Sequence, residues 1–184
     1  MKFRTILLFV TIAFSQILHA TNQSKFRIIY NSNQINNRIG DTLQIKDINV
    51  GLFSNVLVVK LENDKKIFYK PQSIWGYEDE KGTYYRYFKN EFYRIEQIDT
   101  IMIYSYQNEP SALDRDYYFS KTKNSMIFNL SRKKVRRAFC GNPCFLEKLE
   151  KYFKLENRYL SIDTMEAGSI IVDLYKQCKH IKNF

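Results

Sequence analysis

Three cysteines, Cys140, Cys144 and Cys178, carry the most reactive side chains of this 184-residue chain. An odd count leaves one thiol over if two of them pair, and the sequence does not decide among the three possible pairings. The spacing Cys140-Gly-Asn-Pro-Cys144 differs from the CxxC pattern of thioredoxin-like redox sites. We therefore expect a structural disulfide or buried thiols rather than redox chemistry. The short loop between Cys140 and Cys144 favours that pair as the bridge.

Histidine is nearly absent, since the chain holds two residues of this type, His19 and His180. Nucleophilic catalysis of the Ser-His-Asp or Cys-His kind needs a buried and oriented imidazole. Zinc sites with two or three histidines cannot be built when His19 lies in the N-terminal apolar segment and His180 lies close to the chain end. We expect no metal site and no cofactor, and we interpret His180 as a surface residue rather than a lone metal ligand.

Consecutive carboxylates at Glu78, Asp79 and Glu80 precede Gly82. Two carboxyl groups on either side of a bond are the machinery of glycoside hydrolysis. Acidic residues in a turn that ends with glycine are also ordinary turn chemistry. We favour the turn, and a hydrolase that acts on envelope glycan or peptide polymers remains the alternative.

Aromatic residues concentrate between Trp75 and Tyr93, interleaved with arginines. On antiparallel strands such residues must lie on both faces of the sheet. Exposed aromatics flanked by arginine suit a glycan, a peptide or a nucleic-acid base. We favour the alternative that they form cross-strand pairs that stabilise the sheet. The candidate ligand-binding residues in this segment are Trp75, Tyr77, Tyr85, Arg86 and Tyr87.

The net charge of +10 and a basic run at 132–137 admit phosphate groups as partners. The run has no interleaved aromatic residues for stacking, so we favour a solvated helix face. Low Gly and Pro with abundant Lys, Asn, Ile, Tyr and Phe is typical of an AT-rich bacterial genome, and an exported protein needs surface charge for solubility. We do not expect nucleic acid as the partner. Binding of a polyanion, either lipopolysaccharide or nucleic acid, remains a second alternative.

Short segments of alternating, β-branched and aromatic residues predict strands at 25–30, 42–48, 55–61, 66–70, 83–88, 91–98, 100–106, 117–121 and 126–130. Their short links can join only antiparallel neighbours, which predicts a β-meander of about seven to nine strands. Helical spacing then begins at Ser131, and Asn142 with Pro143 is typical of a helix start. A third helix is predicted over about 164–179.

These elements predict an α+β fold, with strands over about 25–130 and two to three helices over about 131–180 that pack on the sheet. The length of 184 residues suits one domain, 21–184, after a removed leader. Residues 1–20 have the features of that leader: Lys2 and Arg4, an apolar run, and the small residue Ala20. The apolar run is shorter than the ~20 residues that span a bilayer. We expect a signal peptide, export to the periplasm or beyond, and no transmembrane segment after its removal.

The stretch IWGYEDEKGTYYRYFKNEFYRI, residues 74–95, has a Trp-Gly-aromatic start, an acidic turn and a closing aromatic strand. It is similar to a segment of small exported proteins of Bacteroidetes that have no assigned function. The likeness extends more loosely to 117–121 and to Asn142-Pro143. It implies envelope export and supplies no catalytic or binding residues; Trp75, Gly76, Gly82, Tyr85 and Arg86 match in pattern alone. Cys140 and Cys144 are not part of the likeness.

We expect an exported binding or structural domain of the bacterial envelope, without catalytic activity, that uses an exposed part of its aromatic sheet. An envelope protein or glycan would be its partner.

Overall fold

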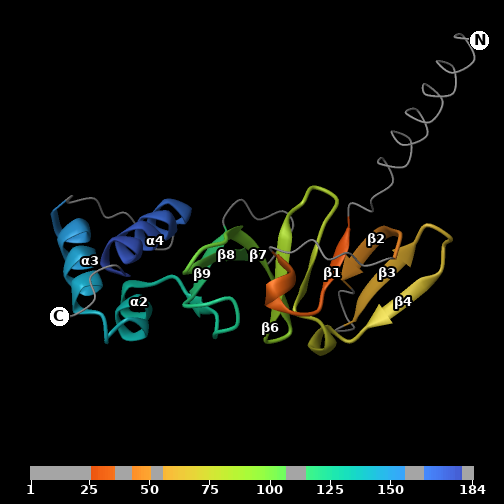
Figure 1. Cartoon of the computed structure of the whole chain (residues 1–184), viewed down its shortest axis with the longest axis horizontal. Helices are drawn as coiled ribbons and strands as arrows, with labels where there is room; N and C mark the ends of the chain where they lie inside the picture. Colours follow the sequence, from red (N-terminus) through yellow and green to blue (C-terminus); the bar gives the residue numbers. More distant parts are fainter. Residues whose placement is uncertain (1–25, 36–42, 51–55, 107–114, 156–163, 180–184) are drawn as a thin grey trace, which may run out of the picture.

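The computed structural model describes residues 26–35, 43–50, 56–106, 115–155 and 164–179. These residues form the predicted α+β fold, with strands first and helices last (Figure 1). The predicted signal peptide, His19 and His180 lie outside the described residues.

The larger sheet is antiparallel throughout and has the strand order β1-β5-β6-β7-β8-β9-β10. Its strands are β1 (Arg27–Ile29), β5 (Gly76–Glu78), β6 (Tyr84–Phe88), β7 (Glu91–Gln97), β8 (Met102–Tyr106), β9 (Asp116–Ser120) and β10 (Phe128–Asn129). Two 3-10 turns are also present, η1 (Ser32–Ile35) and η2 (Pro71–Ser73). From β5 onward each strand pairs with the next one in the chain, so this part is the predicted meander.

A second sheet is formed by β2 (Ile45–Val50), β3 (Leu57–Leu61) and β4 (Lys66–Tyr69). The described residues thus hold ten strands in two sheets, where the sequence predicted one meander of about seven to nine. The additional strand is β5, which lies between the predicted strands 66–70 and 83–88, and the two sheets arise because β1 pairs with β5 instead of β2. Leu57 and Val59 on β3 are fully buried and pack with Ile28 of β1, which places the β2–β4 sheet in its own layer.

Three helices follow the strands: α2 (Arg132–Ala138), α3 (Pro143–Leu155) and α4 (Met165–Lys179). Asn142 caps α3 as predicted, because its Oδ1 accepts a hydrogen bond of 3.0 Å from the backbone N–H of Phe145. Thr164 caps α4 through a bond of 3.2 Å from the N–H of Ala167 to its Oγ1. Within the described ranges, none of the helices has the length and apolar character needed to cross a membrane.

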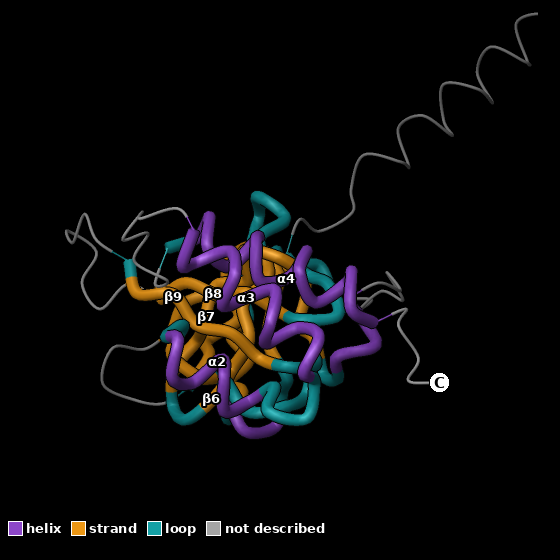
Figure 2. Tube along the Cα trace, turned by 90° about the vertical axis from the view of Figure 1, so that its left-hand side faces the viewer, coloured by secondary structure: helices purple, strands orange, loops and turns teal. Residues whose placement is uncertain are grey.

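The helices cover one face of the larger sheet, which we call the covered face. Ile103 of β8 and Phe119 of β9 lie on this face and form one core with apolar residues of all three helices: Val135, Phe139, Phe145, Leu149, Ile171 and Val172. Gly168 allows α4 to lie close to β8, since a Cβ there would be 3.0 Å from Cγ2 of Ile103. Figure 2, seen from the helix end, shows the helices stacked in front of the strands. The β2–β4 sheet covers the other end of the same face through Tyr77 and Phe92.

The opposite face, which we call the Arg86 face, has a separate core of Ile95, Met102, Tyr104 and Ile127. Strand β8 is therefore buried on both sides: residues 102–105 all lie at 2 % exposure or less. Alternate side chains of a strand point to opposite faces, so both faces of β8 are covered, one by the helices and the other by the core of the Arg86 face. In Figure 1 the helices lie towards one end of the larger sheet and the β2–β4 sheet lies towards the other end.

A disulfide joins Cys144 at the start of α3 to Cys178 at the end of α4, and Cys140 is an exposed free thiol. The pairing favoured from sequence, Cys140 with Cys144, is therefore wrong. Proximity along the chain suggested it, but the packing of α3 against α4 brings the distant Cys178 to a Cα separation of 5.8 Å from Cys144. This distance suits a bridge.

Loss of the bridge should destabilise the fold, because it closes a loop between residues 34 positions apart. We expect the double variant Cys144→Ala/Cys178→Ala to lower the free energy of unfolding by about 2–4 kcal/mol. Cys140→Ser should change it by less than about 0.5 kcal/mol, as is usual for an exposed site. Urea unfolding followed by circular dichroism measures both values. A loss for Cys140→Ser as large as for the double variant would contradict the pairing.

Candidate functional site

The five candidate residues of the aromatic segment do not form one site. Cross-strand register places Tyr77 opposite Tyr85, and Tyr87 opposite Phe92, all on the covered face. Arg86 lies on the other face of β6 and contacts the ring of Trp75. The structure therefore separates Tyr77, Tyr85 and Tyr87 from Trp75 and Arg86 by the thickness of the sheet.

Arg86 is a buried arginine, with 5 % of its surface exposed. Its Nη1 donates to the hydroxyl of Tyr104 at 2.8 Å and to Oγ of Ser120 at 3.4 Å, and its Nη2 donates to the carbonyl oxygen of Ser125 at 2.8 Å. The guanidinium carbon also lies 5.5 to 5.8 Å from the ring centroids of Trp75, Phe88 and Tyr104. Hydrogen bonds and ring faces thus replace the water that a buried charge loses.

Trp75 and Arg86 together hold the turn between β9 and β10, residues 121–125, against the Arg86 face. The indole Nε1 of Trp75 donates to Oδ1 of Asn124 at 3.1 Å and to the carbonyl oxygen of Lys123 at 3.3 Å. The indole N–H of Trp75 and the guanidinium of Arg86 therefore both donate their hydrogen bonds within the protein.

The three tyrosines of the covered face also make internal contacts. Tyr77 stacks on Tyr85 with ring centroids 4.7 Å apart, and the hydroxyl of Tyr85 donates to Oδ2 of Asp79 at 3.3 Å. Burial is the main cause that raises the pKa of Tyr77 and of Tyr85, and the nearby Asp79 carboxylate adds to it. Tyr87 donates to Oδ1 of Asn90 at 3.0 Å. These rings are half-buried.

A second tyrosine group lies on the Arg86 face, where the ring centroid of Tyr93 is 5.3 Å from that of Tyr106 and 5.0 Å from that of Tyr118. The Tyr106 hydroxyl donates to Oε2 of Glu91 at 2.7 Å. Burial, followed by this hydrogen bond to a carboxylate, raises the pKa of Tyr106 to about 12. These hydroxyls stay protonated at neutral pH and act as hydrogen-bond donors.

The acidic turn has structural partners. Glu78 is buried and pairs with Arg27 at 2.9 Å. Oδ1 of Asp79 accepts hydrogen bonds of 2.9 Å from the backbone N–H groups of Lys81 and Thr83, as in an Asx-type turn. The Glu78 carboxylate therefore stabilises the sheet edge, and the Asp79 carboxylate stabilises the turn.

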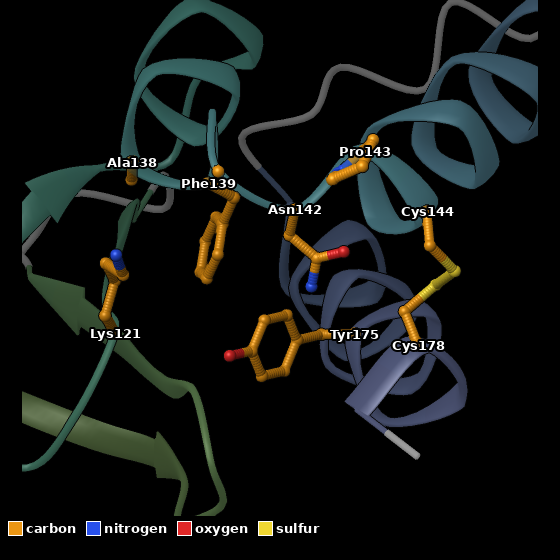
Figure 3. A pocket seen from close by; sticks show the side chains of 9 residues that line it. Lys121, Ala138, Phe139, Asn142, Pro143, Cys144, Tyr175 and Cys178 are labelled. Carbon is orange, nitrogen blue, oxygen red and sulfur yellow. A yellow bond between two sulfur atoms is a disulfide. The ribbon is translucent and has the colours of Figure 1, made fainter. Parts of the chain in front are cut away.

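A pocket of about 370 Å³ lies where α2 ends and α3 begins, beside the disulfide. Its lining residues are Lys121, Ala138, Phe139, Gly141, Asn142, Pro143, Cys144, Tyr175 and Cys178. Figure 3 shows Lys121 and the disulfide on opposite sides, with Phe139, Asn142 and Tyr175 between them. The Nζ of Lys121 lies 5.5 Å from the centroid of the Phe139 ring. The site combines apolar walls with an ammonium, an amide and a phenol, which is the composition of a small-molecule pocket.

Sequence reasoning did not find this pocket, although it identified Asn142, Pro143 and the cysteines as structural residues. Lys121 is the last residue of the predicted strand 117–121, and Tyr175 lies in the predicted third helix, more than 50 positions away. Gly141, Asn142, Pro143 and Cys144 of the short CGNPC link line the pocket, but the partners that complete it come from distant parts of the chain.

The basic run lies on α2, where Arg132 and Arg136 both pair with Glu150 of α3. Its other members, Lys133, Lys134 and Arg137, are exposed. In the part of the chain that the structure describes, no group of three or more His, Cys, Asp and Glu side chains could hold a metal ion.

Comparison with protein-family models, with curated proteins and with solved structures found no match. The similarity to small exported proteins of Bacteroidetes therefore stays a prediction.

The contacts of Arg86 predict that it stabilises the fold. Lysine keeps the charge, but its single ammonium nitrogen cannot take the places of both Nη1 and Nη2, so Arg86→Lys should lower the free energy of unfolding by about 2 kcal/mol. Arg94→Lys is the matched control, because the Arg94 side chain is 40 % exposed and its contact with Glu96 is a loose 3.4 Å. We expect a change below about 0.5 kcal/mol there. Equal changes in urea unfolding for the two variants would refute the assignment.

Proposed function

We propose that this chain is an exported binding domain of the bacterial envelope that works without catalysis, and that its ligand occupies the pocket beside the Cys144–Cys178 disulfide. The observation that carries the proposal is that Lys121, Asn142 and Tyr175 line one pocket together with Phe139 and Pro143. A few polar groups that orient a ligand among apolar surfaces are the general pattern of binding sites. This proposal replaces the aromatic sheet as the binding surface, because the aromatic residues contact one another and the turn at 121–125.

Binding is favoured over hydrolysis by the roles of the carboxylates. A hydrolase of the glycosidase type needs two carboxyl groups that face a substrate. None of the described residues that line the pocket is a carboxylate. Glu78 pairs with Arg27, and Asp79 accepts backbone hydrogen bonds within the acidic turn.

Export is supported by the character of residues 1–20 and by the disulfide, since disulfides persist in oxidising compartments. The exported protein should have the mass of a chain that begins at Thr21. It should contain one disulfide and one free thiol, at Cys140. Mass spectrometry with and without thiol alkylation measures both. A chain that keeps residues 1–20, or one with three free thiols, would contradict export.

A pocket-filling variant tests binding. Gly141 lines the pocket, and a Cβ there would meet no heavy atom within 4 Å, so Gly141→Leu should fold with a large apolar side chain added at the pocket wall. The probe is the neutral aromatic dye N-phenyl-1-naphthylamine, which fluoresces in apolar sites. We expect Gly141→Leu to weaken its saturable binding about tenfold or more.

Glu80→Leu adds the same side chain at an exposed turn and is the matched control, with unchanged dye affinity expected. Backbone amide shifts at Gly141, Asn142 and Tyr175 should report the dye in the wild type. The proposal fails if the wild type shows no saturable dye binding, or if Gly141→Leu binds the dye as well as the wild type does.

A further inference from the structure

Among the nine described residues that line the pocket, Lys121 carries the charge, because the other eight are uncharged. Lys121 is exposed, and its ammonium is held near the face of Phe139 by a cation–π contact of 5.5 Å. A lysine head group kept at the wall of a cavity is oriented without being neutralised, so it stays available for an anion.

The cations of α2 add positive charge on the side of the pocket. Successive helical residues are rotated by about 100°, so Lys134 lies on the same side as Ala138, four positions later, and Arg137 lies about 60° from Lys134. Ala138 lines the pocket. Arg132 and Arg136 lie on the other side and pair with Glu150. Among the residues the structure describes, no ion pair joins Lys134 or Arg137 to a carboxylate.

The partial charges at the helix termini do not change the positive sign of the charge at the pocket. The negative end of α2 and the positive end of α3 both lie at the pocket, so their partial charges oppose each other. Side-chain charge therefore decides which ligand is favoured, and it is positive.

Besides Lys121 and Asn142, the lining side chains are apolar or aromatic. The ring centroids of Phe139 and Tyr175 are 5.1 Å apart at an interplanar angle of 54°, and Pro143 and the disulfide complete the wall. A volume of about 370 Å³ is at the lower end of the range for small-molecule sites. An inorganic ion alone would leave these walls uncovered.

We infer that the pocket binds an amphipathic organic anion, which is a flat apolar body that carries one sulfonate, phosphate or carboxylate group. Its anionic group lies at Lys121, and its apolar body lies against Phe139, Tyr175 and Pro143. This inference rests on the proposed function, because it names the ligand class of the same pocket.

Two dyes that differ in a single group test the inference. 8-Anilino-1-naphthalenesulfonate is N-phenyl-1-naphthylamine with an added sulfonate, so a comparison of the two isolates the negative charge. We expect Lys121→Gln to weaken binding of the sulfonate dye roughly three- to fivefold, as for one partly screened ion pair, and to leave the neutral dye unchanged. Raising the salt concentration should weaken only the sulfonate dye. Lys89→Gln is the matched control, since Lys89 is also exposed and lies 5.6 Å from a phenylalanine ring, that of Phe88.

The inference is overturned if Lys121→Gln changes the affinity for both dyes equally or for neither, or if Lys89→Gln has the same effect as Lys121→Gln. It is also overturned if inorganic phosphate displaces the sulfonate dye at concentrations comparable with those of the dye, since the apolar body would then contribute nothing. In each of these cases the proposed function stands, provided that Gly141→Leu still abolishes binding of the neutral dye. If neither dye binds in a way that Gly141→Leu blocks, the proposed function itself fails.

Discussion

The guanidinium of Arg86 ties together parts of the chain that are far apart in the sheet. Arg86 lies on β6, yet it donates to Tyr104 on β8 and to Ser120 on β9. In a flat sheet, three strand spacings amount to about 14 Å, which is longer than an arginine side chain can span. The sheet must therefore coil around this residue. A charge so deeply buried is tolerated only when hydrogen bonds and ring faces surround it, and this requirement fixes Trp75, Tyr104 and Ser125 about one point.

The same interaction reaches the pocket through the turn at 121–125. The Arg86 bond to Ser125 and the Trp75 bond to Asn124 hold this turn, and Lys121 is its first residue. Ser120, just before it, donates its hydroxyl to the carbonyl oxygen of Thr122 at 2.7 Å. The backbone that carries Lys121 is thus anchored from the Arg86 face, and its ammonium lies against Phe139 beside the helices. The sequence suggested the aromatic segment as a binding surface. On our proposal, this segment instead holds the turn that carries Lys121 at the pocket.

Local patterns in the sequence predicted most elements, including the alternation of Leu57 and Val59 and the start of α3 at Asn142 and Pro143. These local patterns did not predict contacts between residues that are far apart in the sequence. Period-two alternation shows which side chains share a face, but not whether β1 pairs with β2 or with β5. The bridge to Cys178 depends on how α3 packs on α4, and the pocket depends on residues from β9, the α2–α3 link and α4. The division of the aromatics between two faces was predictable; the turn that covers Arg86 was not, because that contact spans 39 positions.

The order of the three cysteines along the chain matters for oxidative folding. In a protein that crosses the membrane N-terminus first, Cys140 and Cys144 reach the oxidising side before Cys178 does. The thiols available at that moment are four residues apart, and they are not the native pair. If they oxidise, the native bridge requires the Cys178 thiolate to attack Sγ of Cys144, which releases Cys140 as a thiolate. Such exchange takes seconds to hours without catalysis. If the protein is exported as we propose, we expect its yield to rise in a host compartment that isomerises disulfides as well as forming them.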